Sequence, residues 1–299
     1  MKRPVVSVVL PTHNRASVLG RAMRSVLAQT LRDIELIVVD DGSRDNTSDV
    51  VASFDDDRVV FIRCEHCAGA AAARNIGINA ARAEWIAFQD SDDEWLLDKL
   101  SQQLRAVNSA PDNTALVCCG YVVMGRTGKV IYVGADRRKQ LGDWAADNIY
   151  DFSFITPTWL ARKDALLTIG KFDEALPNLE DWELAFRLFR NFKMIALDAP
   201  LVVKHGSEDS INPDKLSRSI SLAAILERHR DIWLKTPEVL SKLYDELGSC
   251  QCMSGDVGAG RRSLRLAARY SPSSPKTWIK WIASHFGRQA YARLARLAR

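Results

Sequence analysis

The chain has 299 residues, a formal net charge of +4 and 47% hydrophobic residues. This composition is typical of a soluble globular protein, and the length allows one large domain or one domain with an appendage. No apolar run approaches the ~20 residues of a membrane-spanning helix, and the first residues lack the apolar core and cleavage site of a signal peptide. We therefore expect a cytoplasmic protein.

The distribution of charge and the spacing of the cysteines indicate which partners and which thiol state to expect. Residues Gly255 to Arg299 contain ten Lys or Arg and one Asp, which is +9 and leaves −5 for the rest of the chain. A basic tail on an acidic body favours an anionic partner, either membrane headgroups or nucleic acid. The six cysteines are scattered in close pairs and predict free thiols. Cys64 and Cys67 resemble half a zinc site, but no second CxxC follows.

The first ninety residues alternate between apolar runs and segments of helical periodicity. The runs predict buried strands, and the intervening segments predict amphipathic helices. The expected strands are Val5–Leu10, Ile34–Val39, Val59–Arg63 and Trp85–Gln89, and the expected helices are Ala16–Ala28, about Asp45–Phe54 and Gly69–Ala83. Such alternation indicates βαβ units and a parallel sheet.

Polar clusters follow three of these strands, at the sheet edge where ligands bind in such folds. They are Pro11-Thr12-His13-Asn14, Asp40-Asp41 and Asp90-Ser91-Asp92-Asp93. Crowded carboxylates repel one another, and a hard cation such as Mg²⁺ or Mn²⁺ would remove that cost because it takes carboxylate and phosphate oxygens. A solvated loop that caps the next helix is the alternative for the third cluster. The expected convergence of all three favours a metal–diphosphate site.

The pattern becomes mixed after the fourth strand and helical after about residue 211. Leu116–Met124 and Lys129–Val133 predict a hairpin. The expected helices are Trp95–Leu104 (which Asp93 would cap), Lys163–Ile169, Trp182–Asn191, Pro213–Leu234, Pro237–Met253, Asp256–Arg269 and Thr277–Ala298. We therefore expect two domains, 1–210 and a helical, basic region 211–299.

Five motifs, in a characteristic order, resemble family 2 of the glycosyltransferases, which are inverting enzymes of GT-A fold. The similarity covers about residues 4–210. The motifs are Val6–Arg15, Leu36–Ser43, Ala73–Gly77, Asp90–Asp93 and Glu180–Leu184. The resemblance implies an α/β fold of the Rossmann-like, nucleotide-diphospho-sugar transferase type. It has a mixed, mostly parallel sheet flanked by helices, and here an all-α C-terminal extension follows.

The resemblance also implies how a nucleotide is held. The positions that match the family's base-binding residues are Pro11, Thr12, His13, Asn14 and Asp41. A carboxylate can accept a hydrogen bond from uracil N3–H, which favours UDP. Asp40 either serves the same pocket or caps a turn. Arg74 matches an arginine near the diphosphate, where a guanidinium suits phosphate oxygens; a surface salt bridge is the alternative.

Metal and catalytic residues are implied in the same way. Asp90 and Asp92 match the family's DXD motif around Ser91. Asp92 would ligate Mn²⁺ or Mg²⁺, and Asp90 would lie nearer the ribose or reach the metal through water; Ser91 is assigned to the nucleotide side. His205 is expected to touch the metal or diphosphate, or else to be a surface or core histidine.

Asp181 matches the family's catalytic base, which deprotonates the acceptor hydroxyl during inversion, while the metal stabilises the departing nucleotide diphosphate. Glu180 is expected to position the acceptor or a loop. Both carboxylates would also suit the start of a helix. Trp159 and Trp182 are candidates for shaping the sugar pocket.

The sequence therefore predicts a metal-dependent inverting glycosyltransferase that uses a UDP-sugar. Its expected acceptor is a glycan or lipid-linked oligosaccharide in bacterial surface polysaccharide synthesis. The aromatic and basic residues of Thr277–Ala298 predict peripheral contact with the inner face of the cell membrane, with packing on the catalytic domain as the alternative. No nucleic-acid partner is expected, because the tail lacks a recognised binding motif.

Two other functions remain open. A nucleotidyltransferase would also use paired carboxylates and a metal, but it usually needs a glycine-rich loop after the first strand, and Pro11–Arg15 has no glycine. A non-catalytic scaffold with a decayed donor site is the second alternative. The intact carboxylate sets argue against such decay.

Overall fold

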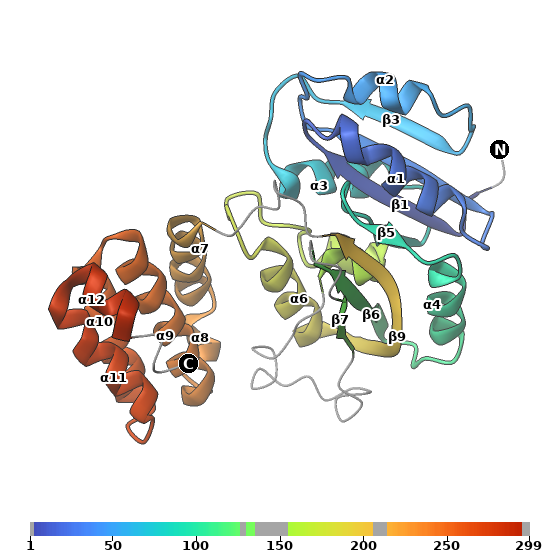
Figure 1. The fold of residues 1–299 in the computed structure, drawn as a ribbon. Helices are drawn as coiled ribbons and strands as arrows, with labels where there is room; N and C mark the ends of the chain where they lie inside the picture. The colour runs from blue at the N-terminus through green and yellow to red at the C-terminus, as the bar shows by residue number, and fades with distance from the viewer. Residues whose placement is uncertain (1–2, 126–129, 135–154, 206–213, 295–299) are drawn as a thin grey trace. The chain divides into compact units, whose positions relative to one another are not determined.

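The computed structural model describes residues 3–125, 130–134, 155–205 and 214–294 (Figure 1). The chain divides into two compact units. The first is an α/β unit formed by Met1–Trp144, Ser153–Glu174 and Leu184–Ser210. The second contains Ala175–Glu183 and Ile211–Arg299, and its described part is helical. No helix among the described residues is long and apolar enough to cross a membrane.

Four parallel strands, in the order β3-β2-β1-β4, form one half of the sheet. They are β1 (Val6–Thr12), β2 (Ile34–Asp40), β3 (Val59–Arg63) and β4 (Trp85–Phe88), connected by α1 (Ala16–Leu27), α2 (Thr47–Ala52) and α3 (Ala70–Ala80). The predicted βαβ alternation is confirmed. β1 runs further than predicted, however, because Pro11 lies beyond the end of β4, where its missing N–H breaks no ladder to that strand.

The other half of the sheet is mixed and continues in the order β8-β6-β9-β5, with β7 paired to β6. The strands are β5 (Glu94–Trp95), β6 (Thr114–Met124), β7 (Val130–Val133), β8 (Leu160–Arg162) and β9 (Lys193–His205). The predicted β6–β7 hairpin is confirmed, with Met124 opposite Val130; its residues 126–129 lie outside the described part. β6 and β9 pair in parallel, whereas β4–β8, β6–β8 and β5–β9 are antiparallel.

The predicted helix Trp95–Leu104 is wrong at its start. Trp95 belongs to β5, where it pairs with Val202 of the distant strand β9, and α4 spans Lys99–Asn108 with Asp98 at its N-cap position. Asp93 therefore does not cap this helix. The remaining elements of the first unit are a 3₁₀ turn at Thr156–Thr158, α5 (Lys163–Thr168) and most of α6 (Glu180–Asn191).

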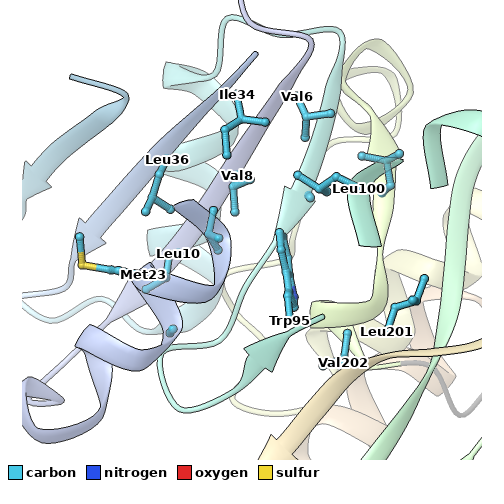
Figure 2. Close-up of a cluster of buried hydrophobic side chains, with 14 of the residues drawn as sticks. Val6, Val8, Leu10, Met23, Ile34, Leu36, Trp95, Leu100, Leu201 and Val202 are labelled. Atoms are coloured by element: carbon cyan, nitrogen blue, oxygen red, sulfur yellow. The ribbon is translucent and has the colours of Figure 1, made fainter. Parts of the chain in front are cut away.

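Apolar side chains from both halves of the sheet share one core. Residues of β1 and β2 meet the inner face of α1, and Trp95, Leu100, Leu201 and Val202 continue this cluster from β5, α4 and β9 (Figure 2). The short strand β5 is therefore held by burial of Trp95, which is 2% exposed. This core joins the parallel strands to the β5–β9 pair. The polar residues at the ends of both therefore keep fixed positions relative to one another.

The glycine of the Ala73–Gly77 motif has a packing role. A Cβ atom at Gly77 would lie 2.3 Å from Cγ1 of Val9 on β1, so only glycine lets α3 lie this close to the sheet. We expect Gly77→Ala to lower the free energy of unfolding by about 1–3 kcal/mol, because overpacking exceeds the gain in helix propensity. Denaturant unfolding measures the change. Gly20→Ala is the matched control, since its Cβ would meet only the flexible Arg24 guanidinium; equal destabilisation of both variants would contradict this explanation.

Lys99 is a fully buried cation on α4. Its Nζ donates to Oε1 of Gln103 at 2.9 Å and lies 3.8 Å from the centroid of the Trp95 ring. Burial lowers the pKa of Lys99 to about 8, whereas a lysine in the unfolded chain titrates near ~10.4. Between these values the unfolded chain binds more protons than the native protein, so stability should rise with pH.

We therefore expect a Lys99→Met variant to lack this rise. The difference in unfolding free energy between the wild type and the variant should change by about 3 kcal/mol in favour of the wild type from about pH 7 to pH 10. Urea unfolding of both proteins at the two pH values gives the number. If the unfolding free energies of the two proteins change in parallel with pH, burial of the charged Lys99 ammonium does not destabilise the native protein.

The second unit contains a succession of helices, as predicted for the described residues after 211. These are α7 (Lys215–Arg228), α8 (Arg230–Trp233), α9 (Pro237–Ser254), α10 (Val257–Tyr270), α11 (Pro275–Ala283), the 3₁₀ turn η4 (Ser284–Phe286) and α12 (Gly287–Leu294). Two predicted helices are interrupted. The first breaks at His229, and the last breaks after Ala283, where Gly287 adopts φ 82° at the start of α12.

Candidate active site

The ends of β1 and β2 are joined by hydrogen bonds into one rim. The Asp41 amide donates to the Thr12 carbonyl at 2.8 Å, and His13 Nδ1 donates to the Asp41 carbonyl at 2.8 Å. The Asn14 amide donates to Oγ of Ser43 at 2.8 Å, with Asn14 at φ 51°. His13 and Asn14 are exposed, whereas Thr12 is buried. The structure therefore brings together the predicted base-binding segments, with Pro11 buried just behind them.

Asp41 is buried and tightly oriented by a loop that sequence reasoning did not assign to the site. Its carboxylate accepts hydrogen bonds from the amides of Ala68 (2.9 Å) and Gly69 (2.8 Å) and from Sγ of Cys67 (3.2 Å). The bond to Asp41, together with burial, raises the pKa of the Cys67 thiol. Gly42 allows this approach, since a Cβ there would lie 3.0 Å from the Cys67 nitrogen. The six cysteines are free thiols, as predicted.

Asp40 supports the turn that follows β2. Its side chain is fully buried, and Oδ1 accepts a hydrogen bond from the Ser43 amide at 2.9 Å, while Nε of Arg63 lies 3.8 Å from Oδ2. Two roles were predicted for Asp40, and the hydrogen bond from Ser43 shows that it caps the turn after β2. A direct contact with a nucleotide stays a prediction.

Arg74 connects α3 to the end of β4. Its Nη2 lies 2.9 Å from Oδ1 of Asp90, and its guanidinium lies 5.5 Å from the centroid of the Phe172 ring. The Arg74 side chain is only 7% exposed, so this ion pair is not the surface salt bridge considered as an alternative. The contact fixes a cation beside the first carboxylate of the Asp90–Asp93 cluster. A buried guanidinium in this position suits phosphate oxygens.

The rest of the cluster is held by its backbone. The Asp92 carbonyl accepts a hydrogen bond from Nη2 of Arg21 at 2.5 Å, and the Asp93 carbonyl accepts one from Nε2 of Gln89 at 2.8 Å. Asp90 and Asp92 are half-buried, whereas Ser91 and Asp93 are buried. This anchoring sets the direction of the loop.

Strand β9 brings two further residues to this cluster. Lys204 Nζ lies 3.7 Å from Oδ2 of Asp93, and Nε2 of His205 lies 3.2 Å from Oε2 of Glu94. Burial and the negative charge of Asp90 raise the pKa of Asp93 to about 8, against the opposing effect of Lys204. His205 thus lies next to the cluster, as its predicted role requires, but it pairs with a carboxylate. Lys204 was missed because its partner is distant in the sequence.

The carboxylates of Asp90 and Asp92 suit a divalent cation that takes only one or two ligands from the protein. Among the described residues, no group of three or more His, Cys, Asp or Glu side chains is placed to hold a metal ion. Mg²⁺ and Mn²⁺ do not need such a cage, because they are commonly held by one or two carboxylates and complete their shell with water and substrate phosphates. Asp90 and Asp92, half-buried at a strand end beside a cationic Arg74, supply that kind of oxygen donor.

Glu180 and Asp181 open α6 and belong to the second unit. Oδ1 of Asp181 accepts a hydrogen bond from the Trp182 amide at 2.7 Å. Leu179, which precedes them, has φ 61°. A positive φ strains the backbone of a leucine, and strained residues of this kind cluster at functional sites. The helix dipole also favours carboxylates in the first turn. The local geometry is therefore compatible with a catalytic or positioning role and with a role at the helix start.

Helices α7 and α8 of the second unit, with the residue between them, pack against the segment that carries these two carboxylates. Glu183 is fully buried, and its Oε1 lies 3.0 Å from Nε2 of His229. The Trp182 ring stacks on Trp233 with centroids 6.2 Å apart. Trp182 remains a candidate for the sugar pocket. Trp159 does not, because it is fully buried in the core of the first unit against Phe88.

Polar residues at the carboxyl ends of the strands, on a mixed sheet flanked by helices, are typical of α/β enzymes that bind their ligands at this edge. Residues 7–170 match the family model described as glycosyl transferase family 2. The chain therefore belongs to this glycosyltransferase family, as its five motifs predicted.

Two relatives show how far the similarity extends. The chain is 30% identical over 209 residues to an uncharacterized glycosyltransferase of Rickettsia prowazekii, which covers 67% of this chain and 63% of that protein. It is 41% identical over 100 residues, or 33% of this chain and 40% of the other, to the Escherichia coli UDP-Glc:alpha-D-GlcNAc-diphosphoundecaprenol beta-1,3-glucosyltransferase WfgD. The matches thus span less than two thirds of these relatives.

Solved structures agree on the fold. Staphylococcus aureus TarS (residues 1–349), in complex with UDP-GlcNAc, superposes with a TM-score of 0.74 at 16% identity, covering 97% of this chain and 90% of that one. The mannosyltransferase PcManGT of Pyrobaculum calidifontis, in complex with GDP-Man and Mn²⁺, gives a TM-score of 0.57 at 17% identity over 99% and 88%. The GT-A fold predicted from the sequence is confirmed.

Proposed function

We propose that this glycosyltransferase is metal-dependent and inverting, and that it transfers a sugar from a UDP-sugar to a glycan or lipid-linked acceptor in bacterial surface polysaccharide synthesis. The observation that carries the proposal is the rim at the ends of β1 and β2, where Asp41 is buried and oriented beside Thr12 and His13. Its carboxylate would accept a hydrogen bond from the N3–H of uracil. The names of the relatives support UDP donors and, for WfgD, a diphosphoundecaprenol-linked acceptor.

The other residues divide the reaction between them. Arg74 would bind the diphosphate, and Asp92, with Asp90 and His205, would hold Mn²⁺ or Mg²⁺, whose positive charge stabilises the leaving UDP. Asp181 would accept the proton of the acceptor hydroxyl as its oxygen attacks the anomeric carbon and the bond to UDP breaks. Glu180 would position the acceptor. A lipid-linked acceptor would also place the basic helical region at the inner face of the cell membrane.

The product distinguishes this function from its alternatives. The purified chain is incubated with Mn²⁺ and single UDP-sugars, with and without a GlcNAc-diphospholipid acceptor, and UDP and pyrophosphate are both measured. We expect acceptor-dependent release of UDP. Pyrophosphate release would favour a nucleotidyltransferase, and turnover only with GDP, dTDP or CMP donors would overturn the assignment of UDP. No turnover and no nucleotide binding would favour the scaffold.

A further inference from the structure

Helix α11 and turn η4 expose a line of large apolar side chains. Trp278, Ile279, Ile282 and Phe286 are 39%, 45%, 51% and 66% exposed. Trp278 and Ile282 are four residues apart on α11, which places them on one face of the helix, and Phe286 follows in the turn η4. Folding normally buries such side chains, so a contiguous exposed set marks an interaction surface. We call these four residues the α11 stripe.

The opposite face of α11 is already committed to the core of its own unit. Thr277, Ala283 and Ser284 are buried, and Trp281 packs against a cluster that includes Leu264 and Tyr291. Further anchors are the pairing of Lys280 with Asp245 and the hydrogen bond from Arg261 to the Ser284 carbonyl at 3.0 Å. The α11 stripe is therefore not a core face turned outward by a loosely packed helix.

The charged residues of the segment that carries the stripe are mostly basic. The exposed residues of α10, α11 and α12 include Arg262, Arg265, Arg269, Lys276, Arg288 and Arg293. Asp256 is the single acidic residue from Gly255 to the end of the sequence. A protein partner with an apolar groove would not by itself require this excess. An anionic lipid surface does, because it attracts basic residues through its headgroups and takes Trp, Ile and Phe side chains into the headgroup boundary.

We propose that the α11 stripe, with its basic surroundings, binds the surface of an anionic membrane. The interaction deepens the proposed function, since it would bring the enzyme to a lipid-linked acceptor. Binding itself requires neither donor nor acceptor. Vesicle binding and sugar transfer can therefore fail independently, and each failure identifies which proposal is wrong.

Vesicle flotation of the full chain tests the proposal. The vesicles contain either phosphatidylcholine alone or equal parts of phosphatidylcholine and phosphatidylglycerol. We expect binding only to the anionic vesicles, weakened by salt. The double variant Ile282→Ser and Phe286→Ser should lower the partition coefficient by at least about 10-fold, and Arg288→Gln by about fivefold. Release of UDP with a water-soluble acceptor should not change in either variant.

Matched controls make the test specific to this surface. Leu216 and Ile220 on α7 are 53% and 51% exposed, so Leu216→Ser with Ile220→Ser removes similar apolar groups elsewhere in the same unit and should leave binding intact. Circular dichroism and melting temperature confirm folding of each variant. Wild-type protein that floats with neither vesicle, or equal loss in both double variants, would overturn the proposal. A concentration-dependent dimer abolished by the stripe variant would overturn it in favour of a second copy of the chain.

Discussion

Replacing Asp181 by Asn is expected to lower kcat for sugar transfer by about 100- to 10,000-fold, the usual contribution of a general base. The amide cannot take the proton of the acceptor hydroxyl. Its oxygen can still accept the hydrogen bond from the Trp182 amide, so the start of α6 should keep its shape. Loss of a first-turn carboxylate should lower stability by no more than about 1 kcal/mol. Initial rates, a melting curve and UDP calorimetry measure the three quantities.

Glu180→Gln is the matched control for this prediction. It removes the same charge from the same turn of α6, and Glu180 is assigned only to positioning. We expect a smaller fall in kcat, with a change in the KM of the acceptor. The reverse order of effects would make Glu180 the base. Full activity in both variants would remove the start of α6 from the catalytic step, whatever the outcome of the donor-site experiments.

Replacing Asp92 by Asn is expected to weaken metal-dependent UDP binding by at least about 100-fold. Loss of a group that merely orients a metal ligand already lowers affinity by about 10- to 100-fold, and Asp92 is assigned to direct ligation. Calorimetry with UDP in the presence and absence of Mn²⁺ gives the metal-dependent part of the affinity. The hydrogen bond from Arg21 to Asp92 uses the backbone carbonyl, so the loop should stay in place in the variant.

Asp98→Asn controls for the loss of an acidic side chain near the same loop. Asp98 lies at the start of α4 and binds Nε2 of Gln102 at 2.6 Å. UDP binding should keep its metal dependence in this variant. If Asp92→Asn binds UDP with unchanged metal dependence, the assignment of the metal to the Asp90–Asp93 cluster is wrong. Binding of UDP that needs no metal even in the wild type would contradict metal dependence itself.

Local sequence patterns were sufficient for the parallel half of the sheet. The apolar runs around Val8, Leu36 and Trp85 and the helical spacing between them carry their own periodicity, so these elements could be recognised without knowing how the strands pair. The prediction failed where a distant pairing partner outweighs the local periodicity. Trp95 follows a pattern that suits a helix, but pairing with Val202 and burial in the core make it a strand residue.

The candidate site divides along the same line. Its three polar clusters followed from residue type at strand ends, because the carboxyl ends of parallel strands converge on one edge, and its other residues followed from the family motifs. The partners of those residues did not follow. Nothing local indicates that the amides of Ala68 and Gly69 orient Asp41, or that Lys204 lies beside Asp93. These contacts depend on loop and strand positions that are set by packing.

The sequence by itself determined the alternation of strands and helices, the family and the residue types on which the proposed binding of UDP and a cation rests. These properties reside in short segments, so they could be interpreted without knowing which segments meet. Only the tertiary structure decided that Glu183 is buried against His229 and that the α11 stripe stays exposed. Burial of a side chain depends on how distant helices pack, and helical periodicity alone does not state which apolar face will be covered.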